Sequence, residues 1–498
     1  MSVMGYSKLT IPLITILVMQ VFVSVAFMDG SKAQVSPDVY VGVDISYGDV
    51  SEAKALIDQV NSFTNLIVIG TTKITWFPDK VNETLQYAYD KGLSFISLPP
   101  SLPDYSSTKV NKTEWYKYAY SMWGDRLLGF YYMDEPGGKQ LDKVQQLTGN
   151  LSSQSSYAEV ADRFTEILSY GIDSDLRSSY SYKSFTSDYA LYWFDYNAGY
   201  DTVFAQFGWN YSRELKIALC RGAATVHNKD WGAIVTWTYT GPPYIESGEE
   251  LYEDLILAYD NGAKYIVVFD GNEGWTGGIL KQEHLDALQQ FWNYVKTNPR
   301  KSTLSSGRSA YVLPEAYGFG FRGPEDHIWG IWEADDLSYN MSINVASLLS
   351  YYGEKLDIIY EDGLQAGNSY GYNQLISWDS YSPPPPKILI LSPANITYTE
   401  SNVTLTFAVD KEVTWIAYSL DNQAQKIIDG NITLSNMADG PHNITVFAKD
   451  EFDSLGVSET ISFSVDIPEP FPTALVAFVI AASAALGAGL IFYIKRRQ

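Results

Sequence analysis

Short apolar runs alternate with segments of helical periodicity between residue 39 and about residue 298. Runs of this length are typical of parallel strands that are covered on both faces. The eight predicted strands are residues 39–45, 66–69, 94–98, 128–133, 190–194, 202–207, 232–237 and 264–269. The predicted helices are residues 52–60, 81–90, 115–123, 157–169, 213–226, 249–259 and 284–295.

This alternation predicts an α/β fold with a parallel sheet. Eight strands favour a closed (β/α)8 barrel over residues 38–299. An open doubly wound sheet is the alternative, because the segment between the fourth and fifth predicted strands is long and the next link is short.

The pattern changes beyond the barrel. Residues 300–382 predict an accessory α/β region, with strand-like segments at 310–313, 328–332 and 356–360 and a helical segment at 343–352. The four prolines at residues 383–386 predict a stiff linker. Residues 387–466 then alternate with a period of two between turns, which predicts a small all-β Ig-like sandwich. Its predicted strands are residues 388–391, 403–409, 414–420, 431–434, 443–448 and 460–465.

One glycine motif in the accessory region matches the dinucleotide fingerprint G-x-G-x-x-G. Its glycines are Gly318, Gly320 and Gly323. The fingerprint must open a helix, whereas here Pro324-Glu325-Asp326 and a predicted strand follow. We therefore interpret the motif as a turn and expect no nucleotide as a partner.

Both ends of the chain carry membrane signals. The apolar stretch behind Lys8 and the small residues around Ser31 predict a signal peptide over residues 1–33, with an uncleaved anchor as the alternative. Residues 471–494 contain no charge and are long enough to form a transmembrane helix, and a basic tail at 495–498 follows. Because basic flanks stay in the cytoplasm, we expect a single-pass type I protein of the cell membrane, with the bulk of the chain outside.

The segment Pro468-Glu469-Pro470, followed by this apolar stretch and basic residues, also resembles the sorting tails of exosortase-like and archaeosortase-like enzymes. That resemblance implies cleavage of the tail and transfer of the protein to another anchor. A plain transmembrane helix is the preferred interpretation.

Composition excludes several classes of protein. The formal net charge of −24 argues against nucleic acid as a partner, since that partner needs a basic face. Cys220 is the only cysteine, so no internal disulfide is possible, and the four histidines are too scattered for a zinc-type cluster. We expect neither a metal nor a cofactor. Nine Asn-x-Ser/Thr sequons suit a surface glycoprotein, and an exported chain without disulfides favours an archaeal source.

Candidate chemistry lies where the predicted strands end, which is where barrels place their active sites. The fourth strand ends on Asp134-Glu135-Pro136. Hydrolysis of a glycosidic bond requires one protonated carboxyl and a second, ionised carboxyl that acts as nucleophile or base. We predict Glu135 as the general acid, because aromatic walls raise the pKa of a carboxyl at a barrel mouth. The predicted partner is Asp270 at the end of strand eight, then Asp195 at the end of strand five, or Asp134 itself.

Other side chains at these strand ends are expected to bind substrate. Asp44 lies near the end of strand one, and Gln206 lies in strand six. Six aromatic residues also fall at or just beyond strand ends, and aromatic rings stack on the apolar faces of sugars. They are Trp76, Trp193, Trp209, Trp237, Tyr239 and Trp275. Packing in the core is the alternative for each of them, because the chain is 15% aromatic.

The Asp134-Glu135-Pro136 motif resembles the Asn-Glu-Pro that ends strand four in the large clan of retaining barrel glycosidases. The resemblance implies a TIM barrel in which Glu135 is the acid/base and residue 134 contacts the sugar 2-hydroxyl. This chain carries Asp where that clan carries Asn, and Thr236-Trp237 stands at the end of strand seven, where the clan has its nucleophilic Glu. Retention and inversion therefore both stay open. Residues 419–421 and 439–446 resemble the Ig-like repeats of archaeal and bacterial surface proteins, which implies a spacer or adhesive module.

These observations predict a membrane-anchored extracellular glycoside hydrolase-like protein whose partner is a poly- or oligosaccharide. The alternative is a non-catalytic surface protein that uses the barrel to bind glycan or to build an envelope layer, and the missing Glu of strand seven favours it. A peptidase or esterase is disfavoured, because the chain has no G-x-S-x-G and no H-E-x-x-H motif.

Overall fold

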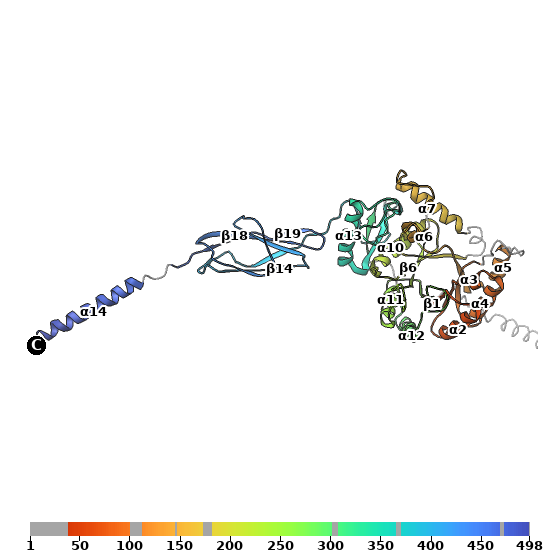
Figure 1. Cartoon of the computed structure of the whole chain (residues 1–498), viewed down its shortest axis with the longest axis horizontal. Helices are drawn as coiled ribbons and strands as arrows, with labels where there is room; N and C mark the ends of the chain where they lie inside the picture. Colours follow the sequence, from red (N-terminus) through yellow and green to blue (C-terminus); the bar gives the residue numbers. More distant parts are fainter. Residues whose placement is uncertain are drawn as a thin grey trace, which may run out of the picture. The chain divides into compact units, whose positions relative to one another are not determined.

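The computed structural model describes residues 38–99, 112–144, 147–172, 182–300, 307–364, 370–468 and 473–497. The predicted signal peptide, residues 1–33, lies outside these ranges. The chain divides into two compact units between Tyr381 and Ser382 (Figure 1). The first unit contains a closed barrel and the accessory region, and the second contains a β-sandwich and an apolar helix.

Eight parallel strands close the barrel in chain order, because β1 pairs with both β2 and β8. The strands are β1 (Tyr40–Ile45), β2 (Leu66–Ile69), β3 (Ser94–Ser97), β4 (Leu127–Tyr131), β5 (Lys183–Asp188), β6 (Thr202–Phe207), β7 (Asp230–Val235) and β8 (Tyr265–Asp270). The surrounding helices are α2 (Val50–Val60), α3 (Thr72–Thr75), α4 (Pro78–Asp90), α5 (Lys112–Trp123), α6 (Pro136–Leu141), α7 (Tyr157–Gly171), α9 (Tyr192–Asn197), α10 (Arg213–Val226), α11 (Gly248–Asp260) and α12 (Gln282–Thr297). The predicted (β/α)8 barrel is confirmed, and the open sheet is excluded.

Side chains along each barrel strand alternate between the interior and the layer of helices. The inward residues form a cluster of their own, made of Tyr40, Leu66, Val68, Ile96, Phe185, Phe204, Ile234, Tyr265 and Val267. The residues between them, such as Val41 and Val43 in β1, pack in the larger cluster under the helices. The same alternation continues to the strand ends, where it decides which polar side chains reach the mouth.

The prediction of a fifth strand at residues 190–194 is wrong. This apolar segment leads into α9, whose Phe194 packs against Trp329 and Tyr360 of the accessory region. Residues 192–196 of this helix are all buried, because both the barrel and the accessory region cover them. The real β5 has the polar sequence Lys-Ser-Phe-Thr-Ser-Asp, and its buried polar groups form hydrogen bonds with neighbouring loops.

The accessory region is a three-stranded parallel sheet in the order β10-β9-β11. Its elements are β9 (Ser309–Leu313), α13 (Asp336–Tyr352), β10 (Leu356–Tyr360) and β11 (Gln374–Ser377). The strand predicted at residues 328–332 is wrong, because Ile328 and Trp332 form only an isolated bridge. A buried ion pair of 2.7 Å between Arg221 of α10 and Asp357 of β10 joins this sheet to the barrel.

The long loop between β9 and α13 packs on α6, the helix that follows Glu135. Gln140 Nε2 donates to the carbonyl of Trp329 at 2.9 Å, and Arg322 pairs with Asp142. Contact is so close that a Cβ on Gly330 would lie 2.5 Å from the carbonyl oxygen of Gln140. The glycine motif, Gly318 to Gly323, lies within this loop, which packs against the barrel. No helix follows the motif directly; the next helix is α13.

The second unit begins with the predicted Ig-like sandwich, which is confirmed. One sheet has the order β12-β14-β17, the other has the order β13-β20-β18-β15-β16, and β19 pairs with β18. The strands are β12 (Ile388–Ser392), β13 (Thr397–Tyr398), β14 (Val403–Val409), β15 (Trp415–Leu420), β16 (Lys426–Ile428), β17 (Ile432–Leu434), β18 (Gly440–Lys449), β19 (Leu455–Val457) and β20 (Ile461–Val465). Alternate residues such as Leu405, Val446 and Phe463 form its core.

The chain continues into α14 (Thr473–Lys495), which corresponds to the predicted transmembrane helix. Residues Ala477–Lys495 have a mean hydropathy of 2.2, and none of them is buried. A helix of this length and composition is compatible with a membrane anchor.

Candidate functional site

The corner between β4 and α6 carries Asp134 and Glu135, and β5 holds it in place. Thr186 Oγ1 donates to the carbonyl of Met133 at 2.6 Å, and the backbone N–H of Glu135 donates to the carbonyl of Ser187 at 3.0 Å. Glu135 has a φ of 53°, in the left-handed region that non-glycine residues rarely adopt. The corner is therefore strained, and contacts from a neighbouring strand fix its geometry.

Asp188, the last residue of β5, stabilises the same corner through hydrogen bonds. Its carboxylate accepts backbone N–H groups of Gly137 at 2.5 Å and Gly138 at 2.9 Å in α6, and also those of Tyr189 and Ala190. Burial raises the pKa of Asp188 to about 7 despite these four donors. Asp195 lies beside it in α9, fully buried, and burial followed by the Asp188 charge raises its pKa far above the usual range. Asp195 is therefore a buried neighbour of Asp188 and does not reach the mouth of the barrel.

Neighbouring side chains contact the carboxyls of Asp134 and Glu135, and Lys139 contacts both. Tyr131 Oη donates to Asp134 Oδ1 at 2.6 Å, and Gln206 Nε2 donates to Glu135 Oε1 at 2.8 Å. Lys139 Nζ lies 3.0 Å from Asp134 Oδ2 and 3.6 Å from Glu135 Oε2. Burial is the main cause that raises the pKa of Glu135, the Asp134 charge adds to it, and Gln206 and Lys139 oppose it.

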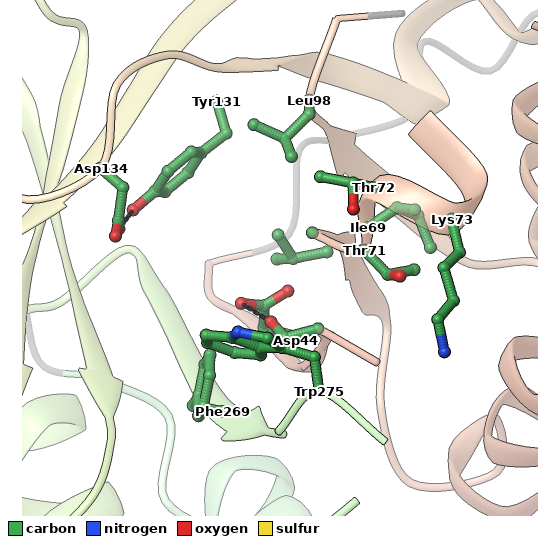
Figure 2. A pocket seen from close by; sticks show the side chains of 13 residues that line it. Asp44, Ile69, Thr71, Thr72, Lys73, Leu98, Tyr131, Asp134, Phe269 and Trp275 are labelled. Atoms are coloured by element: carbon green, nitrogen blue, oxygen red, sulfur yellow. Dashed lines mark hydrogen bonds between the residues drawn. The ribbon is translucent and has the colours of Figure 1, made fainter. Parts of the chain in front are cut away.

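A cavity of about 310 Å³ opens at the carboxyl ends of β1, β2, β4 and β8. Asp44 and Asp134 are the two carboxyls that line it, and Tyr131, Phe269 and Trp275 supply aromatic walls. Figure 2 shows these side chains around one space, with Asp134 beside the Tyr131 hydroxyl. Glu135 does not line this cavity.

Asp44 has an unusual environment for a carboxyl. It continues the inward series of Tyr40 and Gly42, so it points to the cavity. Ser46 Oγ donates to Asp44 Oδ2 at 2.9 Å, whereas Oδ1 is buried without a hydrogen-bond partner in the described structure. Burial raises the pKa of Asp44 to about 7, and the charges of Asp134 and Asp270 add to the effect. This carboxyl can therefore hold a proton near neutral pH and pass it to a ligand.

Asp270, the preferred partner from the sequence, has a different position. It follows Phe269 by one residue, so its side chain points away from the interior. Its Oδ1 accepts backbone N–H groups of Ile279 at 2.5 Å and Leu280 at 3.1 Å, and it is only 2% exposed. Asp270 closes the loop after β8 and does not line the cavity.

The six aromatic residues do not share one site. Trp275 lines the cavity, and Trp237 stacks on it with ring centroids 6.2 Å apart. Trp193 is buried, and its Nε1 donates to Asp362 of the accessory region at 3.1 Å. Trp76 is exposed at the end of α3 and outside the cavity lining. Trp209 and Tyr239 line a separate groove.

Sequence reasoning missed Tyr131, Lys139 and Asp188 as members of this site. Tyr131 could have been found, because it is the last residue of an apolar strand and precedes Asp134 by three residues. Lys139 stands one helical turn after Glu135, which is the spacing of an ion pair. No sequence signal marks Asp188, because its role depends on the correct position of β5.

Comparisons with known proteins give little on function. No family model matches the sequence, and no curated protein matches it. Parts of the chain are similar to fibronectin(III)-like modules of Clostridium thermocellum CbhA, with 14% identity over 16% of this chain and 93% of that one and a TM-score of 0.15. The chain also covers half of a Parabacteroides merdae β-glucuronidase, with 9% identity over 86% of this chain and a TM-score of 0.24. An HMG-CoA lyase from Brucella melitensis gives 11% identity over 52% of this chain and 98% of that one, with a TM-score of 0.29.

These identities and TM-scores are too low to carry a functional argument. The chain is a (β/α)8 barrel followed by a β-sandwich and an apolar helix. Its function has to be argued from the site.

Proposed function

We propose that this chain is a glycoside hydrolase-like protein of the cell surface that acts on a poly- or oligosaccharide at the mouth of its barrel. One observation carries the proposal: Asp44 and Asp134 share a cavity with the rings of Phe269 and Trp275 at the carboxyl ends of the strands. A sugar ring has an apolar face that stacks on aromatic rings, and its glycosidic oxygen needs a proton donor to leave.

In this scheme Asp44 donates its proton to the glycosidic oxygen, since burial raises the pKa of that carboxyl to about 7. Asp134 serves as the second carboxylate; it pairs with Lys139 and accepts a hydrogen bond from the Tyr131 hydroxyl. It attacks the anomeric carbon or takes a proton from the attacking water. Glu135, the acid predicted from the sequence, is the competing donor, because burial also raises its pKa.

The second unit supports a place at the cell surface. We propose that α14 spans the membrane and that the basic residues Lys495, Arg496 and Arg497 lie on its cytoplasmic side. The Ig-like sandwich then serves as a spacer, and the barrel faces the extracellular medium as a type I protein.

The test uses the full chain, purified in detergent and offered a panel of oligosaccharides. Release of reducing ends is measured for the parent, Asp44→Asn, Asp134→Asn and Glu135→Gln. We expect turnover by the parent and loss in both Asp variants. Loss in Glu135→Gln with activity retained in Asp44→Asn reassigns the acid to Glu135. NMR of the first-formed anomer then distinguishes retention from inversion.

The rival function is glycan binding without catalysis. It is favoured by the end of β7, where Thr236 and Trp237 stand in place of a carboxylate. Binding of a glycan by the parent, without turnover under any pH from 4 to about 8, supports this rival and rejects the hydrolase.

A further inference from the structure

The first turn of α6 is capped from another strand. Glu135 stands at the N-cap position of this helix, but its side chain makes no capping hydrogen bond. The backbone N–H groups of Gly137 and Gly138 donate instead to the carboxylate of Asp188, at 2.5 Å and 2.9 Å. The free N–H groups at the start of a helix need such an acceptor. Because Asp188 supplies it, the Glu135 side chain is available to accept a hydrogen bond from Gln206 at the barrel mouth.

The carboxyl of Asp188 acts as an acceptor on both oxygens. Its Oδ1 accepts the N–H groups of Gly138, Tyr189 and Ala190, and its Oδ2 accepts that of Gly137. Each oxygen of an ionised carboxylate offers about two lone pairs, so Oδ2 has a position left for a further donor. A proton on Asp188 itself would occupy an acceptor position. The corner therefore needs the ionised form of Asp188, in a place that is fully buried.

Asp195 is the carboxyl beside it. This residue is fully buried, and neither of its oxygens has a hydrogen-bond partner among the donors of the described residues. The Asp188 carboxyl lies within hydrogen-bond reach of it. Its other titratable neighbours are Tyr192, Tyr200 and Cys220, none of which is a cation. A buried carboxylate without a donor or a cation is strongly unfavourable, so a group in this position keeps its proton.

We infer that Asp195 is protonated and donates a hydrogen bond to Asp188, so that the two carboxyls hold one negative charge between them and position the corner that carries Asp134 and Glu135. Asp195 is then a positioning residue, which acts on the mouth through Asp188 and the first turn of α6. The place of the proton follows from burial and contacts alone. Its consequence for catalysis rests on the proposed function.

Two variants of nearly the same shape separate the role of the proton from packing. Asp195→Asn has no charge and keeps a donor, because its amide N–H₂ replaces the acidic O–H. Asp195→Leu has a similar volume and no donor, so it leaves the buried charge of Asp188 without this partner. If Asp195 only filled space, both variants would behave alike.

The direct test is infrared spectroscopy of the full chain in detergent at pH 9, because a protonated carboxyl and a carboxylate absorb at separate frequencies. This pH lies above the raised pKa of Asp44, about 7, and that of Glu246, about 8. We expect the parent to show a protonated-carboxyl band that Asp44→Asn retains and Asp195→Asn loses. A parent without this band overturns the inference, and so does a band of unchanged intensity in Asp195→Asn.

Hydrogen exchange measured by mass spectrometry reports on the corner itself. In peptides that cover residues 136–141, we expect exchange about tenfold faster in Asp195→Leu than in the parent, because the acceptor of Gly137 and Gly138 has lost its buried donor. Asp195→Asn is expected to stay within about threefold of the parent, and peptides of β1 serve as the reference. Equal exchange in the two variants contradicts the inference. The infrared comparison does not use Asp195→Leu, so it decides the place of the proton even where that variant does not fold.

Steady-state kinetics separate this inference from the proposed function. On an oligosaccharide that the parent hydrolyses, Asp195→Leu is expected to lower kcat about tenfold and to change KM less than about threefold, because the corner moves while the cavity remains. Asp195→Asn is expected to retain kcat within about threefold. An equal loss of kcat in both variants rejects the positioning role. Absence of turnover by the parent rejects the hydrolase, whereas the infrared and exchange results still decide the state of Asp188 and Asp195.

Discussion

Asp44 and Asp270 lie at the same end of two paired strands, yet their carboxyls have opposite environments. In the register of β1 and β8, Asp44 is opposite Phe269 and Asp270 is opposite Ile45. Asp44 points into the cavity, and one of its oxygens has no hydrogen-bond partner among the described residues. Asp270 points outward and accepts two backbone N–H groups. A shift of one residue along a strand thus separates a carboxyl available for chemistry from one that builds a loop.

Whether a side chain at a strand end reaches the cavity thus depends on the inward or outward alternation along the strand as much as on its position at the end. Asp270 is adjacent to Phe269 and ends an apolar strand, so it looked like the better candidate in the sequence. Phe269, which shares its phase with Tyr265 and Val267, is the residue of β8 that reaches the cavity. Four predictions test this distinction between the two carboxyls.

The largest expected effect is on catalysis. Asp44→Asn removes the proton donor, so we expect kcat on a substrate from the oligosaccharide panel to fall by about 10²–10⁴. Asp270→Asn keeps an acceptor oxygen for the loop and is expected to retain kcat within about threefold, because that side chain does not touch the cavity. Equal loss in both variants would falsify the distinction. Circular dichroism checks that each variant is folded.

The second effect concerns stability against pH. The pKa of Asp44 is raised from 3.8 to about 7 in the folded state, so between these values the folded chain holds a proton that the unfolded chain has lost. Stability therefore falls as pH rises through this window. Asp44→Asn removes the dependence and is expected to be more stable than the parent at pH 8, by up to about 4 kcal/mol.

Urea unfolding of parent and variant in one detergent, at pH 4 and at pH 8, measures this difference. We expect a small difference at pH 4 and a large one at pH 8. A variant that is less stable than the parent at pH 8 would show that Asp44 is a structural carboxylate.

The third effect is structural and belongs to Asp270. Asp270→Ala removes the acceptor of two backbone N–H groups in a buried loop, and we expect the free energy of unfolding to fall by about 1–3 kcal/mol. Asp44→Ala serves as the matched control, because it removes a carboxyl with an unsatisfied oxygen and is not expected to destabilise the fold. Chemical denaturation at pH 7 compares them, and the opposite ranking contradicts the assignment.

The smallest effect comes from two glycines, one beside each carboxyl. A Cβ on Gly70 would lie 2.8 Å from Asp44 Oδ1, and a Cβ on Gly278 would lie 2.6 Å from both carboxyl oxygens of Asp270. We expect Gly70→Ala to displace Asp44 and to lower kcat about tenfold, or about 1.4 kcal/mol. Gly278→Ala is expected to lower the melting temperature with less effect on kcat. Steady-state kinetics and thermal melts on both variants show whether the effects separate in this way.

Most strands and helices of the barrel could be predicted from the sequence, because they follow simple periodic patterns of apolar residues. It failed at β5, where Ser184, Thr186 and Asp188 are buried by virtue of hydrogen bonds and give no apolar run. The residues 190–194 were the more convincing strand by pattern alone. Only the accessory region, which covers α9 from outside, explains why residues 192–196 of this short helix are all buried.

The candidate site was predictable to a similar degree. Asp134, Glu135, Asp44, Gln206 and Trp275 all lie at the mouth, as strand ends require. Asp195 and Trp193 were predicted at or just beyond the end of strand five, whereas both lie in α9 and are buried. The division of the aromatic residues between a cavity and a groove depends on loop conformation, which periodicity does not encode.

A fragment of this protein that is meant to keep the site must include the loop between β9 and α13. This loop contacts Gln140 at the end of α6 and Asp142 just after it, five and seven residues beyond Glu135. A fragment that stops at residue 299 would leave this helix bare on one side and would allow the strained Glu135 at its N-cap to relax. A fragment that carries the barrel should therefore end at Tyr381, where the first compact unit ends. It then keeps the accessory region that packs on the helix after Glu135.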